Sequence, residues 1–235
     1  MQNQFSRTEL LIGEDGVNKL QNSHVAVFGV GGVGGYAIEA LVRSGIGEID
    51  LIDNDVFTES NLNRQIYALK STLGKSKVEV AKERIMDINS GCKVNVFKTF
   101  FTPETSGEFD FSKYNYVVDA IDNVTGKIEL VMKCKEAGTP IISSMGTGNK
   151  LHPEMLEISD IYKTFVCPLA KVMRQELKKR GVNKLKVVYS KEVPLKSSAK
   201  DEKTGKPIPG SIAFVPSAAG LIIASEVVNS IVNKD

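Results

Sequence analysis

The feature that most constrains the fold is a glycine-rich turn near the N-terminus. Residues 29–35 read GVGGVGG and follow the apolar run 24–28, which is typical of a strand buried on both faces. A helical pattern begins at Tyr36. Glycines between a buried strand and a helix let the backbone approach a phosphate closely, and the free N–H groups at the helix start attract it. The turn therefore predicts a nucleotide site, without distinguishing a dinucleotide from ATP.

Strand and helix patterns alternate through the first 148 residues. Each apolar, β-branched run is followed by a segment with helical spacing, and Gly138 is expected to cap one of these helices in a left-handed conformation. This alternation predicts an α/β fold with a Rossmann-like, doubly wound and mostly parallel sheet. The expected strands are 24–28, 48–52, 93–97, 116–120 and 140–145, and the expected helices are 36–44, 74–89 and 124–137.

The character of the sequence changes near residue 148. We expect one domain over 1–235, with a nucleotide-binding half at 1–148 and a substrate-binding and dimer half at 149–235 that continues the sheet. No stretch approaches the roughly 20 apolar residues of a membrane span. In the second half we expect strands at 155–159, 185–189 and 211–215, helices at 168–180 and 217–232, and a polar, mobile loop at 194–210.

Acidic and basic residues follow the second strand. Asp53 and Asp55 lie about twenty residues after the glycines, where a carboxylate can hydrogen-bond ribose hydroxyls. Arg64 and Lys77 come next. A hydride-transfer enzyme needs no such cations, whereas an enzyme that handles a triphosphate must neutralise charge as pyrophosphate leaves. These residues favour ATP over NAD, while Lys75 is expected on a solvated helix face.

Five motifs in order resemble the ubiquitin-activating-enzyme-like (HesA/MoeB/ThiF) superfamily within residues 5–150. They are GxGGxG, DxD, NLNRQ, GxxKxE and the DAIDN of residues 119–123. The resemblance implies an ATP-dependent adenylyltransferase in which Arg64, Lys77 and Asp122 act in catalysis and Asp122 binds Mg²⁺. The ATP-binding residues it implies are Gly29, Gly31, Gly32, Gly34, Asp53, Asp55, Asn61, Arg64, Gln65, Lys77, Asp122 and Asn123.

Two of these assignments have their own alternatives or consequences. Asp122 could instead cap the helix that follows it. Arg7, in FSRTELLIG, resembles the N-terminal arginine that reaches into the partner subunit's site in dimers of this superfamily, although its context departs from the sulfur-carrier pattern. The resemblance therefore implies a homodimer with Arg7 as a further catalytic residue.

The remaining sequence resembles the tRNA threonylcarbamoyladenosine dehydratases within that superfamily. The similar segments are RSGIG at 43–47, SDI at 159–161, PLA at 168–170 and FVPSAAG at 214–220. They imply a cytoplasmic enzyme that adenylates the threonyl carboxylate of the modified tRNA adenosine and closes it into a ring, releasing AMP and pyrophosphate. The alternative is an adenylyltransferase that activates the C-terminus of a ubiquitin-like sulfur carrier. A cysteine desulfurase-type partner and no membrane are also expected.

The three cysteines bear on cofactors. Cys92, Cys134 and Cys167 are each more than thirty residues apart, so no CxxC pairs exist to hold a structural zinc ion. We expect ATP and Mg²⁺ but no zinc. Cys92 and Cys134 are expected to be packing residues. Cys167 could accept an activated acyl group, but an intramolecular ring closure does not call for an enzyme nucleophile.

Local basic charge points to RNA. A net charge of +2 is too small for a protein that coats nucleic acid, so any polyanion site must come from clustering. The expected helix 168–180 carries Lys171, Arg174 and Lys178. These side chains could contact tRNA phosphates, or they could form the solvated face of an amphipathic helix.

Overall fold

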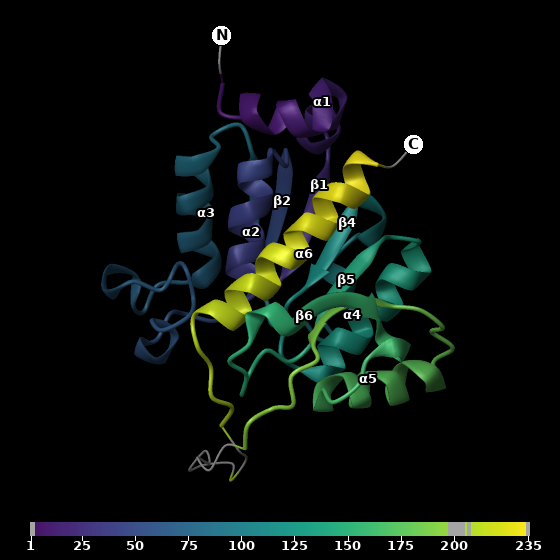
Figure 1. Ribbon diagram of the computed structural model, residues 1–235. Helices are drawn as coiled ribbons and strands as arrows, with labels where there is room; N and C mark the ends of the chain where they lie inside the picture. The colour runs from purple at the N-terminus through teal and green to yellow at the C-terminus, as the bar shows by residue number, and fades with distance from the viewer. Residues whose placement is uncertain (1–2, 197–204, 206–207, 234–235) are drawn as a thin grey trace.

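The computed structural model describes residues 3–196, 205 and 208–233 of the chain. Its centre is a seven-stranded sheet in the order β3-β2-β1-β4-β5-β7-β6 (Figure 1). All neighbouring strands are parallel except β6 and β7. The strands are β1 His24–Phe28, β2 Glu48–Ile52, β3 Lys93–Phe97, β4 Tyr116–Asp119, β5 Ile141–Ser144, β6 Leu156–Asp160 and β7 Lys186–Ser190.

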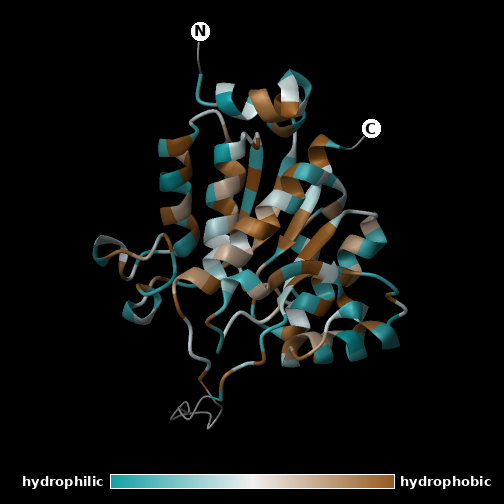
Figure 2. Cartoon of the chain, in the orientation of Figure 1, coloured by the Kyte–Doolittle hydropathy of each residue, from teal (hydrophilic) through white to brown (hydrophobic). Residues whose placement is uncertain are grey.

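Helices cover both faces of this sheet. Because side chains alternate along a strand, Val25 and Val27 face one core and Ala26 and Phe28 face the other. Helices α1, α2, α3 and α6 cover the first face, and α4 and α5 pack on the second. The strands are mainly hydrophobic and the outer side of α5 is hydrophilic (Figure 2). The helices are α1 Ser6–Gln21, α2 Gly34–Ser44, α3 Lys77–Ile88, α4 Val124–Ala137, α5 Pro168–Lys179 and α6 Phe214–Val232.

The structure confirms the predicted fold class. The first three strands and α4 begin and end where the sequence pattern places them. Gly138 caps α4 with a φ of +71°, as its left-handed role requires. The second half does continue the sheet, because β7 pairs with β5 and β6 forms the edge. The functional division near residue 148 stays a prediction, and most of the expected loop at 194–210 lies outside the described residues.

The predicted strand at 211–215 is wrong, because α6 already begins at Phe214. β-branched and aromatic residues favoured a strand, but Pro216 fits the first turn of a helix, where its missing N–H costs nothing. Helical packing then decides the conformation. A Cβ added at Gly220 would lie 2.3 Å from the Val33 carbonyl oxygen, so α6 rests directly on the start of α2.

Two helices, α1 and α6, differ from what the sequence patterns predict. Sequence patterns assigned no element before residue 24, yet α1 forms there with a non-helical residue at Gly13. The expectation that no stretch approaches the length of a membrane span does not hold for α6, which is long and apolar enough by length and composition. In the structure 44% of that stretch is buried, and α6 crosses the sheet beside α2 (Figure 1).

The strand order determines where a ligand can bind. β1 has β2 on one side and β4 on the other. The chain therefore builds one side of the sheet from β1 through β2 and β3, and then returns to build the other side from β4. In an open α/β sheet this reversal leaves a crevice at the carboxyl ends of the strands, where ligands bind. The glycine-rich turn follows β1 at this point.

Candidate active site

A cleft of about 700 Å³ opens at the carboxyl ends of β1, β2, β4 and β5. The glycine-rich turn lies on one side of the cleft, and the start of α5 lies on the other. Most of the residues expected to bind ATP line it, namely Gly29, Gly31, Gly32, Asp53, Asp55, Arg64, Gln65, Lys77, Asp122 and Asn123. The structure therefore brings together residues from five separate segments of the first half.

The turn itself requires glycine at two places. Gly29 has a φ of +94°, and a Cβ there would lie 2.6 Å from the Ala120 carbonyl oxygen. A Cβ at Gly34 would lie 1.8 Å from the Gly29 carbonyl oxygen. The backbone thus doubles back on itself before α2 begins. Gly31, Gly32 and Val33 line the cleft, so backbone N–H groups of the turn just before the helix can hold an anion there.

Asp53 anchors the turn to the end of β2. Its Oδ2 accepts a hydrogen bond from Val30 N at 2.7 Å, and its Oδ1 accepts one from Asp55 N at 2.9 Å. Because a carboxylate has about four acceptor positions, the remaining ones can still receive ribose hydroxyls. Asp53 therefore has a structural role in addition to the predicted ribose contact.

Lys77 is a buried cation beside the glycine-rich turn. It is the first residue of α3, and its Nζ lies 2.7 Å from Asp55 Oδ2 and 3.9 Å from Asp53 Oδ2. The ammonium is almost covered, whereas the Asp55 side chain is 60% exposed. An incoming triphosphate would thus compete with an exposed carboxylate for a cation that is already in place.

Arg64 and Gln65 lie beside the glycine turn. Arg64 Nη1 donates to the Ser60 carbonyl oxygen and to Asn63 Oδ1, both at 2.9 Å, so the rest of the guanidinium fork keeps free donors. Gln65 is buried, and its Oε1 has no hydrogen-bond partner among the described residues. A buried polar atom without a partner is costly, which indicates that a ligand group completes this corner.

Asp122 is free for a cation, because the helix cap is its neighbour. Asn123 is the N-cap of α4, and its Oδ1 accepts from Gly126 N at 2.6 Å. Asp122 is exposed at the cleft, and its carboxylate has no hydrogen bond or ion pair to another described residue. The alternative that Asp122 caps α4 is therefore wrong.

Three of the residues predicted to bind ATP or to act in catalysis lie outside the cleft lining. Gly34 supports the turn from below, and Asn61 Oδ1 accepts from Thr58 N in a 3-10 turn. Arg7 is exposed on α1, which lies at the opposite edge of the sheet, near the start of β2 (Figure 1). Arg7 therefore has no contact with the cleft of its own chain.

The basic face of α5 is only partly free. Lys171 and Lys178 are exposed and carry no ion pair to another described residue. Arg174 is half-buried, and its Nη1 donates to the carbonyl oxygen of Thr164 at 3.0 Å and also to the Thr164 hydroxyl. Arg174 thus holds the segment before α5 in place, in addition to the predicted RNA contact.

Cys92 and Cys134 are packing residues, as the sequence patterns predict. Both thiols are buried, and burial raises the pKa of Cys92 to about 11 and raises that of Cys134 further. A thiol that stays protonated is a poor nucleophile. Cys167 is also buried, but it lines the cleft next to Gly146.

Sequence patterns missed a buried ion pair beneath the cleft. Lys127 Nζ lies 3.0 Å from Asp119 Oδ1 and donates to the Ser144 carbonyl oxygen at 2.8 Å, and both charged side chains are almost fully buried. Ser143 Oγ donates to Asp119 Oδ2 at 2.5 Å. The pair ties the ends of β4 and β5 together under the cleft. Asp119 stands in the DAIDN motif, but nothing local marks Lys127 as its partner.

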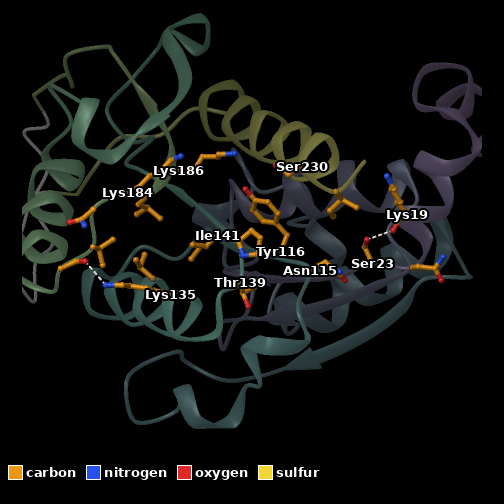
Figure 3. Close-up of a pocket in the computed structure, with 18 residues that line it drawn as sticks. Lys19, Ser23, Asn115, Tyr116, Lys135, Thr139, Ile141, Lys184, Lys186 and Ser230 are labelled. Carbon is orange, nitrogen blue, oxygen red and sulfur yellow. Dashed lines mark hydrogen bonds between the residues drawn. The ribbon is translucent and has the colours of Figure 1, made fainter. Parts of the chain in front are cut away.

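A second and larger cavity lies at the opposite edge of the sheet. It measures about 950 Å³ and lies where β4, β5 and β7 begin (Figure 3). Three of its four lysines already have partners: Lys19 pairs with Asp15, Lys186 pairs with Glu226, and Lys135 donates to a carbonyl oxygen. The second cavity also lacks a glycine turn or a free helix start. We therefore assign nucleotide binding to the smaller cleft.

The fold and the cleft together define a class of protein. The cleft combines a phosphate-binding turn, two cations from Arg64 and Lys77, and a carboxylate on Asp122 that is free to hold a metal ion. Such a set can neutralise a triphosphate while its α-phosphate is attacked. These features define an adenylate-forming α/β protein.

Comparison with known proteins identifies the family. The chain matches the ThiF family over residues 5–235 and belongs to it. It is 47% identical over 239 residues to a tRNA threonylcarbamoyladenosine dehydratase of Bacillus subtilis (strain 168), covering 97% of this chain and 94% of the relative. The E. coli dehydratase crystallised with AMP has a TM-score of 0.89 and 35% identity, with 97% and 93% of the two chains covered. The same enzyme with ATP has a TM-score of 0.87 and 34% identity over the same shares.

Proposed function

We propose that the protein is an ATP-dependent tRNA threonylcarbamoyladenosine dehydratase. The observation that carries this proposal is the convergence of Arg64, Lys77 and Asp122 on a glycine-rich turn in one cleft. Relatives of nearly the same length carry the same activity in their names, and two of the similar crystal structures contain ATP and AMP. These similarities favour the dehydratase over a sulfur-carrier adenylyltransferase.

The reaction needs two substitutions in sequence. An oxygen of the threonyl carboxylate attacks the α-phosphorus of ATP, the bond to the β-phosphate oxygen breaks, and pyrophosphate leaves. A nitrogen of the substrate's carbamoyl group then attacks the activated carbonyl carbon, loses its proton, and expels AMP. The elements of water are lost from the nucleoside as the ring forms. Because the nucleophile and carbonyl belong to one molecule, their effective concentration is high, and Cys167 is not needed.

The residues of the cleft divide this work. Lys77 and Arg64 neutralise the charge that develops as pyrophosphate departs. Asp122 would hold a Mg²⁺ ion, since carboxylate oxygens are ligands that Mg²⁺ prefers and this one is not otherwise engaged. The ion would supply further neutralisation of the phosphates. The exposed Phe100 ring at the cleft wall offers an apolar surface for the adenine base. No zinc is required by this chemistry.

The test is a nucleoside digest of tRNA after incubation with protein, ATP and Mg²⁺. We expect the threonylcarbamoyl nucleoside to be replaced by a product lighter by one water, with one AMP formed for each ring. Omission of ATP should leave the nucleoside unchanged. If ATP–pyrophosphate exchange instead responds to the free C-terminus of a ubiquitin-like protein and not to tRNA, the sulfur-carrier activity is the correct one.

A prediction concerns tRNA contact by α5. Each phosphate that a lysine neutralises adds a little under one unit to the slope of log affinity against log salt. The double variant Lys171→Gln/Lys178→Gln should therefore flatten that slope by roughly two units and raise the KM for tRNA. The KM for ATP should stay unchanged, because neither Lys171 nor Lys178 lines the cleft. Arg174 is kept, since its replacement would also release Thr164.

The matched control removes two exposed lysines near the other end of the sheet. Lys93 and Lys113 pair with Glu48 and Asp110, and both side chains are more than half exposed. The variant Lys93→Gln/Lys113→Gln has the same change in net charge. Its salt slope should equal that of the wild type. An unaltered slope in the α5 variant would show that this helix is only a solvated face.

We also propose a homodimer in which Arg7 of one chain serves the cleft of the other. Arg7 is exposed and remote from its own cleft, which a residue with a function in the partner's site would be. Light scattering at micromolar concentration should give twice the chain mass of 25.6 kDa. A monomer with full activity would contradict this proposal. Because tRNA is the substrate, we further propose that the enzyme acts in the cytoplasm and needs no membrane. We also propose a cysteine desulfurase-type protein as a partner.

A further inference from the structure

Lys150 is a buried cation at the far end of the cleft. It belongs to the loop after β5, lines the cleft together with Cys167, and is only 4% exposed. Its Nζ donates to the Gly146 carbonyl oxygen at 2.6 Å. An ammonium group has three donors, and only one of them has an acceptor among the described residues.

The backbone on both sides of Lys150 is anchored. On one side Asn149 N donates to the Gly210 carbonyl oxygen at 2.7 Å, and Asn149 Oδ1 accepts from Gly210 N at 2.6 Å. On the other side the buried Glu192 carboxylate accepts from the N–H groups of Leu151 and His152 at 2.9–3.1 Å. The loop therefore holds Lys150 in a defined place before any substrate arrives, as binding groups require.

Lys150 has no ion pair to another described residue. The nearby Glu192 carboxylate accepts hydrogen bonds from backbone N–H groups instead of pairing with the ammonium. Burial lowers the pKa of Lys150, and the nearby Cys167 and Glu192 oppose this shift. A buried ammonium without an ion pair is costly, and an anion placed beside it would remove that cost.

The position of Lys150 separates it from the triphosphate residues. Arg64, Lys77 and the glycine turn lie around the ends of β1 and β2, whereas Lys150 follows β5, which is two strands from β1 in the sheet. Each step between neighbouring strands is about 4.8 Å, so the two groups of cations belong to different sides of the cleft. That separation leaves room for the α-phosphate and an acyl group between them.

We propose that Lys150 binds the carboxylate of the acyl substrate and presents it to the α-phosphate of ATP. One carboxylate oxygen accepts a hydrogen bond from the ammonium while the other faces the phosphorus. After adenylation the same ammonium holds the carbonyl oxygen, where negative charge develops when the carbamoyl nitrogen attacks. This inference rests on the proposed function and names Lys150 as the group that selects an acid-bearing nucleoside.

The test measures the preference of the protein for modified tRNA. The same tRNA is prepared in two forms, one with the threonylcarbamoyl group and one without it. The affinity of the protein for each form is measured in the presence of a non-hydrolysable ATP analogue. The phosphate contacts are common to both forms and cancel in the ratio. In the wild type the modified form should bind more tightly. In Lys150→Gln, which keeps a donor for the Gly146 carbonyl, the preference should fall about tenfold or more, as expected for a lost charge-assisted hydrogen bond.

Two further variants make the outcome decisive. Lys150→Arg keeps the charge and should retain most of the preference, and Lys113→Gln removes an exposed charge and should retain all of it. Binding of the ATP analogue alone reports whether each variant is folded and should be unchanged. If the Lys150→Gln variant binds the analogue normally and still prefers the modified tRNA, the inference is overturned. A wild type that forms no ring product would instead overturn the proposed function.

Discussion

Replacement of Lys77 by alanine is expected to lower the rate of AMP formation about a hundredfold or more, and Arg64→Ala should do the same. Both side chains supply positive charge where pyrophosphate leaves. Lys77 has a second effect, because its Nζ is paired with Asp55 and lies near Asp53. Without the ammonium, two carboxylates would face the phosphates unneutralised. The loss should therefore appear in single-turnover AMP formation and also in the affinity for ATP.

Lys75 provides the matched control. It lies two residues before Lys77 and is exposed, and Lys75→Ala removes the same charge from the same segment. Its rate should stay close to that of the wild type. Normal turnover in both Lys77→Ala and Arg64→Ala would contradict the assignment of the triphosphate site to this cleft.

The second large effect concerns stability. Lys127→Met should lower the free energy of unfolding by about 3–5 kcal/mol, because it leaves the buried Asp119 carboxylate without its counterion. For a chain of this size that loss corresponds to a fall in Tm of roughly 6–20 °C. Thermal unfolding followed by circular dichroism measures the effect. Affinity for ATP should fall as well, since the pair holds the ends of β4 and β5 beneath the cleft.

A double-mutant cycle separates the ion pair from the packing of the lysine stem. Asp119→Asn alone should also destabilise, because Lys127 then keeps a buried charge. The double variant Lys127→Met/Asp119→Asn contains no buried charge and should be more stable than the sum of the single effects predicts. Strictly additive effects would show that the ion pair contributes nothing beyond the size of the side chains.

Strands that are buried on both faces could be predicted because their signal is local. The run 24–28 is mostly apolar, and its boundaries match β1. The segment 211–215 has the same kind of composition, yet its end is helical, since contact with α2 outweighs intrinsic β preference. Membership in the superfamily was predicted correctly for a related reason. Its motifs are short, and each one combines a turn with the residues that the turn presents.

Sequence by itself determined which groups could meet a triphosphate. The glycine turn follows β1, Asp53 directly follows β2, and Asp122 lies just beyond β4. Because these strands pair in parallel, all three segments lie at the carboxyl ends of the strands. Tertiary structure decided which charged groups remain available there. Asn123 caps α4 and so leaves Asp122 free, and Lys127 forms an ion pair with Asp119. Lys150 is buried without an ion pair to a described residue, and the nearby Glu192 carboxylate accepts from backbone donors. Those partners are set by contacts between distant segments, and no local pattern encodes a contact of that kind.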